Sequence, residues 1–383
     1  MQTRHNSSFA HLQQELPQRA IQPTFEDLSP QSSYRLDMTL SDFLPQPNPP
    51  PVLPPTTPAK ELPIPHHLLY FEPSKRQSDM LPDGTNPDQS PGPPFERRMW
   101  AGGRVLYNHD NPLHLDGRRG VCQEFIRRVD IKGKTGEEKV FVAIERRLAK
   151  ASADECARLA RVAAAAGGAG GAEKDLAQEK EDLYHRVRQR LWRDSEEDFG
   201  EASILETRNI VFLKGKNPPP PAAAQAKNDS ASASASASAG KPPAAGGKML
   251  KPELTPDYEH TILPDPKLLF RFSALTFNAH AIHLDPQYSR EIEGHRNLLF
   301  HGPMSFMFMM TLLQQKLAAA AAQGGGGKKE VIKSVEYRNM APLYCGEKVK
   351  FAGTKTGERK WEVWAETPEG GLAVRGKVVT EAR

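Results

Sequence analysis

The residues best suited to chemistry lie in one run, from Phe270 to Pro303, which reads FRFSALTFNAHAIHLDPQYSREIEGHRNLLFHGP. It contains four histidines close to carboxylates and amides: His280, His283, His295 and His301. A neutral imidazole exchanges protons near neutral pH and therefore suits general acid–base catalysis. The run predicts a site at which protons are transferred, with His295 expected at the surface.

The His-Gly-Pro at the end of this run predicts the first turn of a buried helix. Proline is favoured at the first helical position, and Gly302 directly precedes Pro303. A helix N-terminus offers N–H groups and the positive end of the helix dipole to an anionic oxygen. Glycine also permits a ligand to approach closely. We therefore expect the Gly302 N–H to be an oxyanion donor; the alternative is a role in helix packing alone.

The elements that must position these residues form a repeated pattern in the second half of the chain. Residues 304–317 predict the one strong buried helix, because apolar side chains occur on nearly every face. Alternating apolar and polar residues predict strands at 258–263, 268–272, 331–338, 348–353, 361–366 and 372–379. One long helix followed by antiparallel strands is typical of a curved sheet wrapped around a helix, the hot-dog arrangement.

The first half predicts a second unit of the same kind. Strands are expected at residues 33–40, 99–107, 122–132, 139–147 and 204–213, with a charged helix inserted at 151–198. Two such halves would form an internal pseudo-dimer. The predicted fold class is therefore α+β, a double hot-dog fold with two curved antiparallel sheets, each wrapped on a central helix.

Composition divides the chain into four parts. Residues 1–30 are polar and predict a disordered tail or a mitochondrial presequence, and residues 31–213 form an N-terminal hot-dog domain without catalytic residues. Residues 214–250 are rich in Pro, Ala and Ser and predict a disordered linker. Residues 251–383 then form the catalytic hot-dog domain.

The charge balance and the cysteines exclude several classes of protein. With 51 basic and 47 acidic residues the net charge is +4, too even to indicate nucleic-acid binding but compatible with a phosphopantetheine arm or an acidic carrier protein. The spacing of Cys122, Cys156 and Cys345 fits neither a metal motif nor a disulfide framework, and we expect no metal and no cofactor. No apolar run approaches the roughly 18 residues that a membrane-spanning helix needs.

Residues 273–285, together with His301-Gly302-Pro303, resemble the MaoC-type hydratase/dehydratase family of double hot-dog proteins. Residues 65–73, 97–104 and 335–346 are similar to the same family and occur in its order. Within it, the fungal mitochondrial 3-hydroxyacyl-thioester dehydratases of type 2 are the most similar group. The resemblance implies reversible dehydration of (3R)-3-hydroxyacyl thioesters to trans-2-enoyl thioesters, on acyl carrier protein in mitochondrial fatty acid synthesis.

Two other functions remain open at this stage. The related mesaconyl-type hydratases act on coenzyme A thioesters of small diacids, which would require a cationic partner such as Arg271 or Arg338. The third reading is an acyl-thioester binding protein without catalytic activity.

The resemblance also implies roles for single residues. In the family motif an Asp and a His stand five residues apart; here His283 falls on the His and Asn278 on the Asp. An amide cannot act as a general base, so His283 is expected to be the acid/base and Asn278 to hold the β-hydroxyl or water. His280 is expected to orient this network or to relay a second proton; the alternative is a structural histidine.

Four further residues are candidates for contacts with the substrate. Arg338 and Asn339 are expected to contact the pantetheine or a carrier phosphate, with a salt bridge or turn contact as the alternative. Trp100 and Phe71 are candidates for the lining of an acyl tunnel, although plain core positions are the simpler interpretation.

The segment at residues 110–116, which contains the sequence NPLHLD, resembles the catalytic motif, but no His-Gly helix start follows it. We interpret it as a loop of the non-catalytic half, with His114 as a weaker alternative site. A homodimer of the pseudo-dimer is left open.

Overall fold

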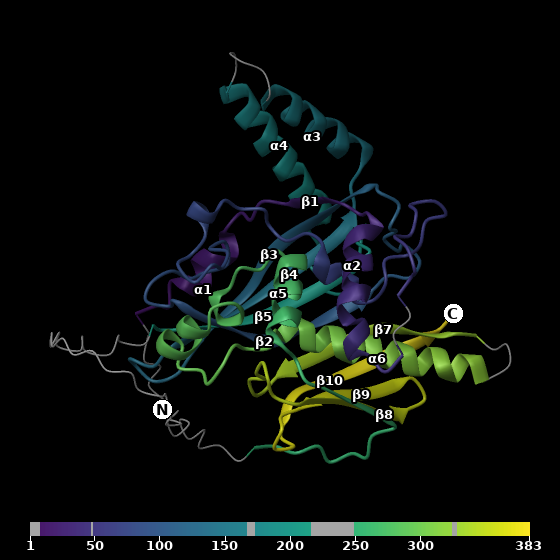
Figure 1. Ribbon diagram of the computed structural model, residues 1–383. Helices are drawn as coiled ribbons and strands as arrows, with labels where there is room; N and C mark the ends of the chain where they lie inside the picture. Colours follow the sequence, from purple (N-terminus) through teal and green to yellow (C-terminus); the bar gives the residue numbers. More distant parts are fainter. Residues whose placement is uncertain (1–7, 47–48, 167–172, 216–248, 324–327) are drawn as a thin grey trace, which may run out of the picture.

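The computed structural model describes residues 8–46, 49–166, 173–215, 249–323 and 328–383 (Figure 1). The predicted linker lies outside the described residues from 216 to 248. The ten strands are β1 (Thr24–Asp27), β2 (Arg97–Tyr107), β3 (Arg119–Lys132), β4 (Lys139–Lys150), β5 (Ile204–Leu213), β6 (Tyr258–Ile262), β7 (Glu330–Asn339), β8 (Val349–Gly357), β9 (Lys360–Glu366) and β10 (Leu372–Ala382).

These strands form one antiparallel sheet in the order β1-β3-β4-β5-β2-β7-β10-β9-β8-β6. The first five strands in this order belong to the first half of the chain and the last five to the second half. The halves meet where β2 pairs with β7, with Gly103 opposite Tyr337. The predicted α+β class is confirmed, but the two expected sheets are joined into a single sheet that does not close.

Helix α6 (Gly302–Gln323) is the long helix of the second half and packs against β7, β8 and β9. Its side chains are buried on nearly every face, from Met304 to Leu317. The alanines after Leu317 extend the helix to Gln323, as predicted. Because Gly302 is its first residue, the prediction of a helix that begins at the His-Gly-Pro sequence is confirmed.

The other helices are shorter or lie at the periphery. They are α1 (Leu12–Glu15), α2 (Pro30–Leu40), α3 (Ala153–Ala166), α4 (Glu173–Leu191) and α5 (Pro266–Leu275), with 3₁₀ turns at Leu16–Gln18, Ser41–Phe43, His66–Leu69, Gln77–Asp79 and Ala281–His283 and a π-helical turn at Tyr288–Ile292. None of the helices in the described parts of the chain is both long and apolar enough to cross a membrane.

Two predicted strands are helices. Residues 33–40 belong to α2, where Pro30 starts the helix and Ser33, Leu36 and Leu40 are buried at helical spacing. Residues 268–272 belong to α5, because the side chain of Asp265 accepts a hydrogen bond from the Leu268 N–H at 2.8 Å and caps the helix. Over a window as short as five to eight residues, the pattern of apolar residues does not distinguish the helical period of about 3.6 from the strand period of 2.

The inserted segment contains two helices where one was predicted. Helices α3 and α4 pack against each other and project away from the sheet (Figure 1). Leu183, Val187 and Leu191 of α4 are buried against Val121 of β3. These contacts hold the base of the α3–α4 pair against the sheet. The insertion therefore rests on the outer side of the first half.

The expected disordered tail is wrong for residues 8–30. Leu12, Leu16 and Ile21 are buried in a cluster with Phe95 and Val129, and β1 pairs with β3. The first 30 residues are polar on average, and this average concealed the few apolar side chains that pack into the core.

Candidate active site

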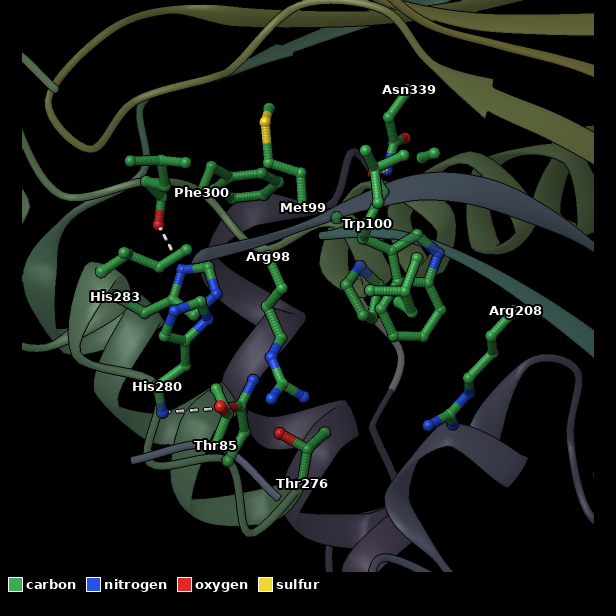
Figure 2. Close-up of a pocket in the computed structure, with 18 of the residues that line it drawn as sticks. Thr85, Arg98, Met99, Trp100, Arg208, Thr276, His280, His283, Phe300 and Asn339 are labelled. Atoms are coloured by element: carbon green, nitrogen blue, oxygen red, sulfur yellow. Dashed lines mark hydrogen bonds between the residues drawn. The ribbon is translucent and has the colours of Figure 1, made fainter. Parts of the chain in front are cut away.

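A cavity of about 510 Å³ lies between the two halves. Its walls come from β2 and β5 of the first half and from α5, the 278–283 loop and the start of α6 in the second (Figure 2). The residues that line it include Arg98, Met99, Trp100, Arg208, Thr276, Asn278, His280, His283, His295, Phe300, Gly302 and Asn339. Most of the residues predicted for chemistry therefore share one cavity.

His283 is buried in the cavity wall with its ring orientation fixed. Its Nδ1 donates a hydrogen bond to the Leu299 carbonyl at 2.9 Å, which leaves Nε2 with a lone pair for a ligand. Burial lowers the pKa of His283 to about 4, although the Leu299 hydrogen bond acts in the opposite direction. His283 is therefore neutral at pH 7 and available as a base.

His301 supports the ring of His283. The two rings stack with centroids 3.7 Å apart, and His301 is fully buried. Its Nε2 lies 2.8 Å from the hydroxyl of Ser273 on α5. Burial lowers the pKa of His301 well below its usual value, so the stack is one of two neutral rings.

The loop before His283 places Asn278 and His280 at the same cavity. The side-chain oxygen of Asn278 accepts a hydrogen bond from the His280 N–H at 3.0 Å, which leaves the amide nitrogen of Asn278 for a ligand. The Nε2 of His280 lies 3.5 Å from a carboxylate oxygen of Asp83, a buried residue of the first half. Burial, followed by the neighbouring charges of His283, Arg98 and His295, lowers the pKa of His280 well below its usual value.

Gly302 lies at the wall between Asn339 and Trp100. The Asn339 side-chain amide donates a hydrogen bond to the Trp100 carbonyl at 2.8 Å, and a Cβ on Gly302 would lie 2.9 Å from that amide nitrogen. Within the described chain, the Gly302 N–H makes no hydrogen bond. A donor at a helix N-terminus is therefore available next to the cavity.

Comparison with known proteins identifies the family. The model of hydroxyacyl-thioester dehydratase type 2 matches residues 65–165 and 173–345. The chain belongs to the hydroxyacyl-thioester dehydratase type 2 family. Its members are hydro-lyases, enzymes that add or remove water.

Two curated relatives are similar over most of their length. Mesaconyl-C(4)-CoA hydratase of Chloroflexus aurantiacus is 24% identical over 84% of this chain and 85% of the relative. The mitochondrial hydroxyacyl-thioester dehydratase type 2 of Schizosaccharomyces pombe is 24% identical over 82% of this chain and 85% of the relative. A MaoC-like dehydratase from Phytophthora capsici, 13% identical, has a TM-score of 0.53 over 97% of this chain and 99% of its own, which supports the fold.

In this dehydratase-family chain, several predicted contacts lie elsewhere. Arg271 and Arg338 are exposed and do not line the cavity. Phe71 is fully buried in the core, whereas Trp100 lines the cavity, where its indole N–H donates to the Tyr337 hydroxyl at 3.0 Å. His295 lines the cavity instead of lying free at the surface.

The NPLHLD segment connects β2 to β3, as the loop interpretation predicted. His114 pairs with Glu61 through the backbone and does not line the cavity. Among the described residues, no group of three or more His, Cys, Asp or Glu side chains is placed to hold a metal ion.

Sequence reasoning placed Trp100 of the first half at the site but missed Arg98. Arg98 on β2 extends into the cavity beside Thr85 and Thr276 (Figure 2). Its guanidinium donates to the Asn86 carbonyl at 3.0 Å and lies 5.0 Å from the Phe212 ring centroid. No carboxylate of the described chain lies within 4.0 Å of it; burial lowers its pKa, and the more distant charge of Asp83 acts in the opposite direction.

Arg208 lies at another part of the wall, in a buried charge network. It is paired with Glu206 and Glu72, both at 3.0 Å, and Arg146 is paired with Glu206 at 2.7 Å. The guanidinium carbon of Arg208 lies 5.0 Å from the centroid of the Trp100 ring, and this contact holds the indole at the cavity. Arg98 and Trp100 belong to the RRMWAGG segment; the sequence proposed Trp100 for the tunnel lining but assigned no contact to Arg98.

Proposed function

We propose that the protein reversibly dehydrates (3R)-3-hydroxyacyl thioesters to trans-2-enoyl thioesters, with the second half of the chain supplying the acid/base and the first half a wall of the cavity. The observation that carries the proposal is the convergence of His283, Asn278 and Gly302 on one cavity. A base, a hydroxyl-binding amide and an oxyanion donor are the three groups that this reaction requires.

In the dehydration direction, the Nε2 of His283 takes a proton from the α-carbon. The electron pair of that C–H bond forms the double bond to the β-carbon, and the C–O bond breaks with its pair on oxygen. The proton on His283 passes to the departing hydroxide and produces water, so that the ring is neutral again.

Two groups stabilise charge during this step. The Asn278 amide nitrogen donates to the β-oxygen, because its side-chain oxygen is already used by His280. The Gly302 N–H donates to the thioester oxygen, on which negative charge develops. Removal of a donor of this kind typically costs ~10²–10³ in rate.

The carrier and the compartment are part of the proposal. We propose acyl carrier protein as the carrier and mitochondrial fatty acid synthesis as the setting; the mitochondrial hydroxyacyl-thioester dehydratase of Schizosaccharomyces pombe supports the compartment. Arg338 and Asn339 end β7 beside the cavity, and the exposed Arg338 guanidinium is suited to a phosphate of the pantetheine arm.

The test is hydration of trans-2-enoyl thioesters by the purified protein, followed by the loss of the conjugated absorbance. Acyl groups of increasing length are presented on coenzyme A and on acyl carrier protein. The proposal predicts turnover to the (3R)-hydroxy product. Binding of the thioester without turnover would instead support a non-catalytic binding protein.

Arg98 favours a second candidate, a hydratase of small diacid thioesters. A buried guanidinium without a carboxylate partner is costly, and a carboxylate at the far end of a short acyl chain would provide that partner. The similarity to mesaconyl-C(4)-CoA hydratase supports the same substrate class.

Comparison of Arg98→Met with the wild type separates the two candidates. If diacids are the substrates, kcat/KM for the diacid thioester falls by at least 10-fold more than kcat/KM for a monoacid thioester of equal length. Equal losses on both substrates would remove this candidate.

A further inference from the structure

The motif lacks a carboxylate at position 278, but a buried carboxylate, Asp83, lies beside His280 on the loop between Gln77–Asp79 and β2. We propose that Asp83, from the first half of the chain, is a positioning residue that orients His280 for the reaction. The inference rests on the proposed function, and it makes the two halves parts of one catalytic centre.

Asp83 is only 5% exposed and holds its carboxylate in a fixed orientation. One oxygen, Oδ1, accepts hydrogen bonds from the Thr85 N–H at 3.0 Å and from the Thr85 hydroxyl at 2.5 Å. The other, Oδ2, lies 3.5 Å from the Nε2 of His280, and neither of these two atoms has a hydrogen-bond partner in the described chain. The free oxygen therefore faces the free ring nitrogen.

The two loops are locked together around this pair. The Ala281 N–H donates to the Asp83 carbonyl at 2.9 Å. Gly84 has φ +79°, and a Cβ there would lie 2.2 Å from the Ala279 carbonyl oxygen. Only glycine fits this contact, so the Asp83 loop is held against the histidine loop.

Charge explains why the pairing matters. A buried carboxylate needs a partner, and among the described Lys, Arg and His side chains only His280 lies within 4.0 Å of Asp83, whereas Arg98 interacts with it from farther away. The carboxylate favours the tautomer with the proton on Nε2, which leaves the lone pair of Nδ1 for the cavity.

Each histidine then presents one unprotonated nitrogen to the substrate. His283 offers Nε2, because its Nδ1 donates to the Leu299 carbonyl, and His280 offers Nδ1, because its Nε2 faces the Asp83 carboxylate at 3.5 Å. The Nδ1 of His280 accepts a hydrogen bond from the β-hydroxyl or water, and the amide of Asn278 donates to the same oxygen. The leaving oxygen is thus held from two sides while His283 moves the proton.

Asp83→Asn tests the role of the carboxylate with little change in shape. With its oxygen on Thr85, the new side chain turns its NH₂ toward His280 and favours the wrong tautomer, as in the Asp-to-Asn variant of a Ser-His-Asp triad. We expect kcat to fall on the order of 10²-fold, the low end of what general acid–base catalysis contributes, with KM little changed. The ¹⁵N resonances of the His280 ring should report the change of tautomer.

Three comparisons separate positioning from a structural role. Asp83→Glu should restore part of the activity, and Asp79→Asn, at an exposed position of the same segment, should change nothing. In a His280→Gln background, Asp83→Asn should cause no further loss of kcat, because it acts through His280. A thermal unfolding midpoint measured for each variant identifies any that fail to fold.

Undiminished kcat in Asp83→Asn, or the same fold-loss with and without His280, would overturn the inference. Full activity in His283→Ala would instead overturn the proposed function, so the two failures are distinguishable.

Discussion

A single methyl group on Gly302 should slow the enzyme strongly without unfolding it. In Gly302→Ala the new Cβ would lie 2.9 Å from the Asn339 amide nitrogen and 3.4 Å from the Trp100 Cβ. Ordinary contacts need roughly 3.5 Å or more, so the Asn339 amide nitrogen and the new Cβ must separate by about half an ångström, whereas the Trp100 contact is already ordinary. Asn339 cannot yield freely, because its amide is bonded to the Trp100 carbonyl at 2.8 Å.

The expected loss follows from this displacement. The start of α6 must shift, and with it the Gly302 N–H that faces the thioester oxygen. Since a misplacement of about 1 Å can cost ~10² in rate, we expect kcat for enoyl-thioester hydration to fall by 10- to 100-fold. Alanine is a better helix former than glycine, so the unfolding free energy should change by less than about 1 kcal/mol.

Gly357→Ala is the matched control, because a Cβ at that position meets its nearest neighbour at an ordinary 3.7 Å. Hydration rates and urea unfolding are measured for both variants. Wild-type kcat in a folded Gly302→Ala protein would refute the oxyanion role of this helix start.

Two further predictions concern stability. Leu16→Ala should lower the unfolding free energy by about 2–4 kcal/mol in urea titrations, because Leu16 is 1% exposed in the core; no loss would show that the first helical turns do not pack. Acid should also destabilise the fold: burial lowers the pKa of His66 to about 3 and of His67 and His283 to about 4, so the unfolded state binds more protons below about pH 6.5. His283 alone contributes about 3 kcal/mol that is lost between pH 6.5 and 4, and burial of Asp37, which raises its pKa to about 6, opposes only part of the sum. Equal unfolding free energies at pH 7 and pH 5 would contradict this assignment.

The sequence predicted the helices and strands whose structure is determined by residues close together in the chain. The start of α6 at His-Gly-Pro depends on the preferences of three adjacent residues, and the strands of the second half follow from alternation along each strand. His283 and Asn278 could be placed in one site because they stand within one short motif that resembles the family's, and both line the cavity; their roles stay a prediction.

Two residues of the first half, Asp83 and Arg98, could not be predicted in this way. Arg98 lines the cavity and Asp83 lies against His280 only because β2 pairs with β7 and the loop at Gly84 packs on Ala279. Contacts between residues so distant along the chain leave no periodic signal. The helices α2 and α5 were mistaken for strands for a related reason: their caps, such as Asp265, lie outside the apolar run that was considered.

The central claim is that His283 moves the proton, and His283→Ala tests it most directly. The measurement is kcat for hydration of a trans-2-enoyl thioester, alongside His185→Ala on the exposed face of α4 as a control. Loss of general acid–base catalysis predicts a fall of ~10²–10⁴ in the first variant and wild-type activity in the second. Retention of full activity in folded His283→Ala would contradict the assignment.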